Sequence, residues 1–149
     1  MTSKKVFLDA NVWFSASHSP SGGSFLLMEF AKEGLLYVYA NDHVLDEAER
    51  NLLLKSPESI EVFYNLVEKV SPSILPAFIT SDVSRKLDGV LPESDVPVIA
   101  GAISSGADYL VTLDKKHIAN EKMRNFGLPF KIMLPGEFLV LFREERRKT

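Results

Sequence analysis

Two short apolar runs in this chain end abruptly at an aspartate. The run Lys5-Val6-Phe7-Leu8 is followed by Asp9, and the run Tyr109–Leu113 is followed by Asp114. Apolar runs of this length are typical of strands that are buried on both faces of a parallel sheet. Parallel strands need a crossover connection, which is usually a helix. The two runs therefore favour a chain in which strands alternate with helices.

The remaining segments supply this alternation. Further strands are expected over Leu35–Ala40 and Lys131–Leu134, and helices over Ser24–Lys32, from Asn41 or Asp42 onward, over Pro57–Val70, from Ser94 or Asp95 to Gly106, and over Gly136–Arg146. Ser15–Gly23 is rich in Ser, Pro and Gly and predicts a loop. Ser71–Asp82 is rich in turn residues and supports no assignment. This order predicts a parallel sheet with helices on both faces and no second domain.

Charge and sulfur content narrow the classes of function. The chain has 149 residues, a net charge of −3 and no cysteine. Disulfides and thiolate metal sites are therefore excluded, and a cytoplasmic location is favoured. The negative charge argues against binding of nucleic acid by bulk charge, but a metal-dependent nuclease needs clustered carboxylates that lower the net charge. No stretch reads as a signal peptide, and no apolar run approaches the ~20 residues of a membrane helix.

Carboxylates are expected to meet at one edge of the sheet. In open α/β sheets, ligands bind outside the carboxyl ends of the strands, where Asp9 and Asp114 would lie. Asp95 begins a helix, and Glu47 lies in the first turns of another, so both can reach the same edge. Clustered carboxylates repel one another unless a cation neutralises them. Oxygen ligands favour Mg²⁺ or Mn²⁺ over Zn²⁺, and such ions support phosphodiester hydrolysis.

Each of these acids also has an ordinary structural role. An aspartate after a strand can cap the next helix, which applies to Asp9, and Asp95 is placed to cap its own helix. Asp114 could pair with a neighbouring lysine, and helical phase does not separate Glu47 from its acidic neighbours. The residues alone leave a metal site and these structural roles open.

The order of these motifs resembles the PIN-domain family over nearly the full chain. Val6–Val12 resembles its first motif, a strand followed by Asp-x-Asn; Val44–Ala48 is similar to its glutamate-bearing helix; Pro92–Ala102 and Gly106–Asp114 resemble its third and fourth motifs, the latter with Thr-x-Asp; and Leu134–Leu139 resembles its closing segment. The second motif selects Glu47 among the acids of its helix.

The resemblance implies a three-layer Rossmann-like PIN fold over residues 1–149, and Mg²⁺- or Mn²⁺-dependent hydrolysis of RNA, as in VapC-type toxins. By family position, the catalytic, metal-binding acids would be Asp9, Glu47, Asp95 and Asp114, with Asn11 and Thr112 supporting them through hydrogen bonds. The resemblance also implies a homodimer and an antitoxin protein as partner.

The chain departs from this family at His117. Many toxin members carry an acid there, three residues beyond the position of Asp114. We expect His117 to contact phosphate or to lie on the surface rather than to bind metal. Trp13 and Phe14 follow the first motif, and we expect them to pack in the core rather than to stack on bases.

Three other classes compete with a nuclease. A response-regulator-like domain would need a lysine at the end of a late strand, where Asp114 stands. A haloacid-dehalogenase-like phosphatase would need a second aspartate two residues after Asp9, where Asn11 stands. The alternative that stays open is a PIN-like module that binds nucleic acid or assembles without cleaving, although the presence of every expected acid argues against a decayed site.

Overall fold

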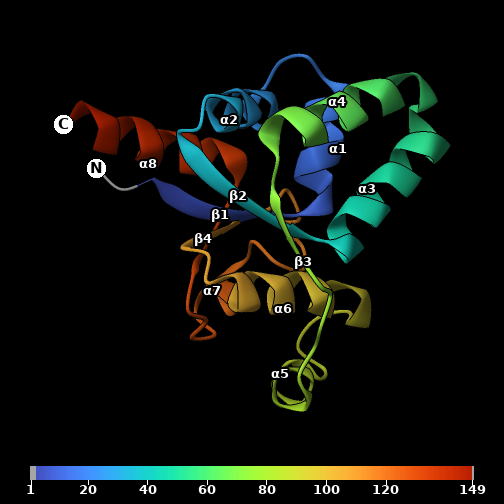
Figure 1. The fold of residues 1–149 in the computed structure, drawn as a ribbon. Helices are drawn as coiled ribbons and strands as arrows, with labels where there is room; N and C mark the ends of the chain where they lie inside the picture. The colour runs from blue at the N-terminus through green and yellow to red at the C-terminus, as the bar shows by residue number, and fades with distance from the viewer. Residues whose placement is uncertain (1–2, 149) are drawn as a thin grey trace.

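The computed structural model describes residues 3–148, and its centre is a parallel sheet between two layers of helices (Figure 1). The sheet has five strands in the order β3-β2-β1-β4-β5. Their bounds are β1 Lys4–Leu8, β2 Leu36–Asn41, β3 Ser73–Leu75, β4 Tyr109–Val111 and β5 Lys131–Met133. Every pair of neighbours runs parallel, so the expected three-layer α/β fold is confirmed.

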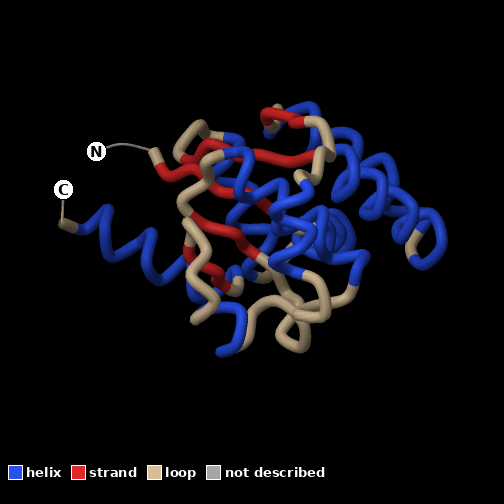
Figure 2. Tube along the Cα trace, turned by 90° about the horizontal axis from the view of Figure 1, so that it is seen from below, coloured by secondary structure: helices blue, strands red, loops and turns tan. Residues whose placement is uncertain are grey.

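Helices cover both faces of the sheet. One layer holds α1 (Ala10–His18), α2 (Gly23–Lys32), α4 (Ile60–Val70) and α8 (Pro135–Arg147), and the other holds α5 (Ser81–Leu87), α6 (Val96–Ser105) and α7 (Glu121–Arg124). From the end of β2, α3 (Asp42–Lys55) extends beyond the sheet and contacts α1 (Figures 1 and 2). Across residues 3–148, no helix combines the length and apolar character needed to cross a membrane.

The register between β1 and β4 decides where the two strands end. Leu8 lies opposite Val111, and both are fully buried. The N–H of Asp9 continues this ladder by donating to the Val111 carbonyl at 3.0 Å. Chain connections run from β1 outward to β2 and β3 on one side, while β4 and β5 lie on the other. The two strand ends therefore meet at the reversal of strand order, where α/β sheets bind ligands.

Close packing in the core fixes α6 against this region. Phe7 and Trp13 are fully buried, and the Trp13 ring meets the Phe63 ring edge-on at 6.4 Å. The expected core position is thus borne out for Trp13, whereas Phe14 is only partly buried and packs against the outside of the core. On α6, a Cβ at Gly101 would lie 2.6 Å from Phe7 Cζ and 2.5 Å from Asn41 Nδ2. Only glycine allows α6 to approach β1 and β2 this closely.

The expected loop over Ser15–Gly23 is wrong in its first half, because α1 continues to His18. Val12, Trp13 and Ala16 form a buried helical stripe that outweighs the serines. The Ser17 hydroxyl is accommodated inside the helix because it donates to the Trp13 carbonyl at 2.8 Å. The connection to α2 is limited to residues 19–22.

Other differences concern short elements. The strand expected over Tyr109–Leu113 ends at Val111, and Leu113 is exposed. The unassigned segment Ser71–Asp82 contains the edge strand β3 and the start of α5. The remaining expected helices and strands are present with ends shifted by a residue or two, except that Pro57–Val70 opens with a 3₁₀ turn over Pro57–Ser59.

Candidate active site

A cavity at the carboxyl end of the sheet brings the expected acids together. Its volume is about 230 Å³, and its lining consists of Asp9, Ala10, Asn11, Phe14, Glu47, Asn51, Lys55, Asp95 and Asp114. The acids come from the end of β1, the second turn of α3, the start of α6 and the loop after β4. Four separate parts of the fold therefore contribute one carboxylate each.

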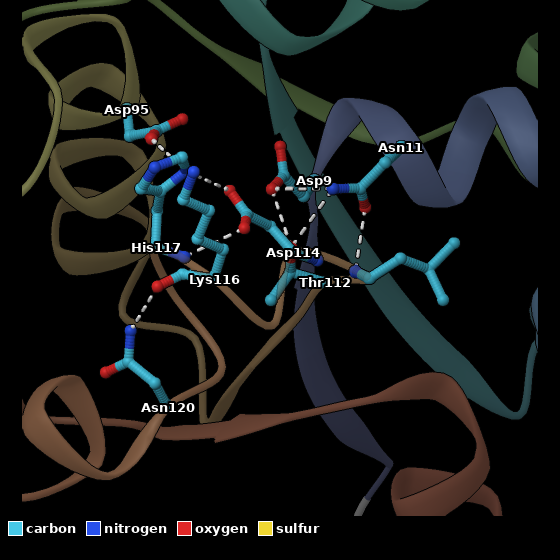
Figure 3. Close-up of polar contacts among 9 residues, drawn as sticks. Asp9, Asn11, Asp95, Thr112, Asp114, Lys116, His117 and Asn120 are labelled. Atoms are coloured by element: carbon cyan, nitrogen blue, oxygen red, sulfur yellow. Dashed lines mark hydrogen bonds and ion pairs between the residues drawn. The ribbon is translucent and has the colours of Figure 1, made fainter.

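Asp9 has both of its carboxylate oxygens engaged. As the N-cap of α1 it accepts the Ala10 N–H at 2.7 Å through Oδ1. Its Oδ2 accepts the Thr112 hydroxyl at 2.8 Å and the Asn11 side-chain amide at 3.3 Å (Figure 3). The side chain is almost completely buried. Helix capping and placement in the cavity are thus combined in one residue, rather than being alternatives.

Thr112 and Asn11 connect the end of β1 to the loop after β4. The buried Thr112 hydroxyl accepts from Asn11 Nδ2 at 3.2 Å and from the Asp114 N–H at 3.1 Å. In turn, Asn11 Oδ1 accepts the Leu113 N–H at 2.9 Å. This network orients Asp9 directly and fixes the backbone of Asp114, as supporting groups around metal ligands do.

Asp95, Asp114 and His117 lie close to one another beside the cavity (Figure 3). His117 Nδ1 lies 3.4 Å from Asp114 Oδ2 and 3.9 Å from Asp95 Oδ2. One ligand atom from each of these residues lies within 4.8 Å of the others, a spacing that could hold a metal ion. The structure therefore places His117 within the acidic group, and not as an isolated surface residue.

The ordinary roles considered for these two acids are not realised. Asp95 stands at the N-cap of α6, but its side chain makes no capping hydrogen bond. Within residues 3–148, the basic side chain that lies within 4 Å of the Asp114 carboxylate is His117, not a neighbouring lysine. Asp114 Oδ1 instead accepts the His117 N–H at 2.9 Å, which fixes the turn after β4.

The acids influence one another electrostatically. Burial raises the pKa of Asp9 to about 6, against hydrogen bonds from Thr112 and Ala10 that lower it, and the charges of Glu47 and Asp95 raise it further. Burial also raises the pKa of Asp95, and the charge of Asp114 is the next largest cause. A cation among the acids would relieve this repulsion.

Part of the cavity wall was not predicted from the sequence. Asn51 and Lys55 line it together with Glu47. His43 precedes them on the same helix, and its Nε2 is buried without a hydrogen-bond partner among residues 3–148. His43, Glu47, Asn51 and Lys55 are spaced four residues apart, which places them along one face of α3. This spacing is the sequence signal that could have linked Asn51 and Lys55 to Glu47.

A larger depression of about 670 Å³ lies at the other end of the strands. Two of its charged side chains already have partners: Lys4 pairs with Glu145 at 2.7 Å, and Asp108 accepts the Lys5 N–H at 3.1 Å. It contains no cluster of acids, so the smaller cavity is the stronger candidate for chemistry.

Comparison with known families agrees with this geometry. A sequence model described as PIN domain matches residues 5–116, which include every acid of the cavity. The chain belongs to the PIN-domain family. Among solved structures, this PIN domain is similar to a chain in the crystal structure of VapBC2 from Rickettsia felis bound to a DNA fragment from their promoter. The TM-score is 0.60 at 13% identity, and the alignment covers 87% of this chain and 98% of the other. At that identity the likeness shows the fold. The curated proteins contain no match.

Proposed function

We propose that this PIN domain, residues 1–149, is a divalent-metal-dependent endoribonuclease in which Asp9, Glu47, Asp95 and Asp114 hold Mg²⁺ or Mn²⁺. The observation that carries the proposal is the convergence of these acids on one cavity of about 230 Å³ at the reversal of strand order. Membership of the PIN-domain family supports it independently.

The residues present fit a divalent cation. In residues 3–148, no lysine forms an ion pair with any of the four acids, and the ion-pair contacts of Asp95 and Asp114 are with His117. The cavity therefore gathers negative charge without a resident counter-charge of equal size. Carboxylate oxygens are the ligands that Mg²⁺ and Mn²⁺ prefer.

The residues around the proposed metal centre have different roles. Thr112 and Asn11 hold Asp9 in one orientation, and the turn closed by the His117 N–H holds Asp114. Glu47 projects from α3, so its position depends on the packing of that helix rather than on the sheet. A bound divalent cation would supply the positive charge that stabilises a phosphodiester as negative charge develops on it.

His117 bears on the choice of metal. Its imidazole lies next to Asp95 and Asp114. This is the sequence position at which the resemblance to toxin members leads us to expect an acid. Both ions prefer oxygen ligands, but Mg²⁺ demands them more strictly, whereas Mn²⁺, a first-row transition ion, tolerates an imidazole nitrogen better. We therefore propose that Mn²⁺ supports the reaction better than Mg²⁺.

The resemblance to toxins of toxin–antitoxin pairs suggests which partners this protein binds. The likeness to a chain of a VapBC2 structure supports the proposal that this protein is the toxin of a toxin–antitoxin pair. RNA would be its substrate, an antitoxin its inhibitory partner, a homodimer its assembly and the cytoplasm its location. A small antitoxin reading frame immediately upstream of the gene would support the pairing, and an unrelated upstream gene would count against it.

A cleavage assay separates the nuclease from the non-catalytic alternative. Purified protein is incubated with a mixed pool of RNA in Mn²⁺, in Mg²⁺ and in chelator, beside a variant with Asp9→Asn, Glu47→Gln, Asp95→Asn and Asp114→Asn. Asp46→Asn is the matched control, because Asp46 is an exposed acid of α3 outside the cavity lining. We expect metal-dependent cleavage by the parent and the control and none by the fourfold variant. RNA bound but left intact by the parent would favour the non-catalytic module.

A further inference from the structure

The acid cavity continues beyond the acids into a wall of different chemistry. Phe14, Asn51 and Lys55 line this part. Phe14 lies one turn after Asn11 on α1, while Asn51 and Lys55 lie one and two turns after Glu47 on α3. Because α1 and α3 pack against each other, the wall runs away from the acids along the two helices.

Phe14 is held as a fixed aromatic surface. Its neighbour Trp13 is fully buried, whereas Phe14 is half-buried and borders the cavity. The Phe14 ring stacks on the His18 ring, with centroids 5.6 Å apart and planes at 29°. His18 is itself anchored, because its Nδ1 lies 2.9 Å from the Ser56 hydroxyl. An aromatic face that is immobilised in this way loses little entropy when a flat ligand stacks on it.

Lys55 supplies positive charge at the far end of the wall. It is the last residue of α3 and is exposed, and no carboxylate in residues 3–148 lies within ion-pair distance of it. Asn51 stands between it and Glu47 and offers both a donor and an acceptor. The cavity thus has acids at one end, an ammonium without an ion pair among residues 3–148 at the other, and an aromatic ring beside them.

We propose that Phe14, Asn51 and Lys55 form a nucleotide subsite next to the scissile phosphate. A base stacks on Phe14, and Lys55 contacts a flanking phosphate while the acids serve the bond to be cut. The inference rests on the proposed nuclease function and adds specificity-determining residues to it. A base stacks on a side chain only when it is unpaired, so the subsite accepts a single-stranded nucleotide.

The test combines side-chain and base deletion. A short RNA that the protein cleaves in Mn²⁺ is synthesised as a series, each member lacking the base of one nucleotide near the cleavage site, and kcat/KM is measured for each. For the parent, one abasic position should lower kcat/KM roughly tenfold to a hundredfold, the scale of one lost stacking contact. Phe14→Leu should lower kcat/KM on the intact RNA by a similar factor and should be insensitive to that position.

Conservative and distant variants guard against unfolding. Phe14→Tyr keeps the ring and should retain the parent's abasic profile. Phe78→Leu changes an aromatic side chain that is 70% exposed and outside the cavity, and should also match the parent. Lys55→Gln should reduce the salt dependence of KM by about one phosphate contact, whereas Lys69→Gln, at the end of α4, should not.

The outcomes of this test separate the two proposals. Cleavage by the parent with the same abasic profile in Phe14→Leu would overturn the subsite and leave the nuclease standing. Absence of metal-dependent cleavage by the parent would overturn both. Loss of the abasic signal in Phe14→Leu, together with its retention in Phe14→Tyr, supports the subsite.

Discussion

Asp9 carries two tasks that usually fall to different side chains. One oxygen caps α1, and the other is held by Thr112 and Asn11 within the cavity. Burial makes its charge costly, which is why its pKa lies well above the usual value for an aspartate. The residue therefore offers a way to measure the electrostatic cost of the site without metal.

Replacing Asp9 by asparagine should remove a pH dependence of stability. The folded pKa of Asp9 is raised from 3.8 to about 6, so the native state binds a proton there that the unfolded state releases. The stabilising effect of that proton is complete below about pH 4 and is lost as pH rises through about 6. The change amounts to about 3 kcal/mol in free energy of unfolding at most.

Urea unfolding of the metal-free proteins between pH 4 and pH 7 measures this effect. The parent should lose stability relative to Asp9→Asn as pH rises, and the difference should level off above about pH 7. Parallel curves for the two proteins across this range would contradict the buried, repelled carboxylate.

His117 tests the proposed choice of metal. His117→Asp replaces the imidazole near Asp95 and Asp114 by an oxygen ligand. Cleavage in Mg²⁺ relative to Mn²⁺ should then rise severalfold, because Mg²⁺ selects oxygen. Lys116→Gln, at the exposed neighbouring position, is the control and should leave the ratio unchanged. An unaltered Mg²⁺ to Mn²⁺ ratio in His117→Asp would remove the imidazole from the metal environment.

At the scale of elements, the Asn41 side chain connects α3, which carries Glu47, to α6, which begins after Asp95. Asn41 caps α3 by accepting the Val44 N–H at 3.0 Å, and its Nδ2 donates to the Pro97 carbonyl of α6 at 3.1 Å. Gly101 of α6 lies directly against this side chain. The relative position of two cavity acids thus depends on a contact that neither acid makes.

Gly101→Ala should disturb the packing of α6 against Phe7 and Asn41. The added Cβ would meet Phe7 and Asn41 at distances below 3 Å, and both partners are held in place, one by the core and one by two hydrogen bonds. We expect a loss of about 1–3 kcal/mol in unfolding free energy, as for other overpacked cores. Gly136→Ala is the matched control, because its Cβ would meet no atom within 4 Å in α8. Equal stability of the two variants by chemical denaturation would contradict the close approach.

How far sequence predicts this fold depends on whether an element's signal is local. The buried strand β1 and the helix that begins at Asp95 were predictable, since apolar runs and helix starts are read within one segment. The edge strand β3 was not, because its three residues, with Ile74 half exposed, become a strand only by pairing with β2.

The residues of the site likewise divide into those that could be predicted from the sequence and those that could not. Three of its acids could be placed because Asp9 and Asp114 follow strands and Asp95 begins a helix. Glu47 lies within α3 and was selected only by the family resemblance. Lys55 shares a helix face with Glu47, and this could have been read from their spacing. Phe14 could not be placed beside them, because its proximity depends on how α1 packs on α3. Whether Asp95 caps its helix also depends on side-chain geometry that the sequence does not specify.

At the scale of the whole molecule, strand order explains why distant residues meet. Asp9 and Asp114 are separated by most of the chain, yet the parallel pairing of β1 with β4 brings their strand ends level. The helices α3 and α6 complete the cavity from either side. A cation bound there would link four elements of the native fold and should stabilise that fold as a whole, because a ligand stabilises only the state that binds it.

Thermal melts in chelator and in rising Mn²⁺ test this central claim most directly. The parent and the Asp46→Asn control should gain stability with Mn²⁺, reaching about 2.7 kcal/mol at a hundred times the dissociation constant. Asp114→Asn should lose most of that gain, because it removes a carboxylate of the cavity while keeping the shape of the side chain. A parent that Mn²⁺ does not stabilise, or an Asp114→Asn variant that Mn²⁺ stabilises as strongly as the parent, would contradict the metal site.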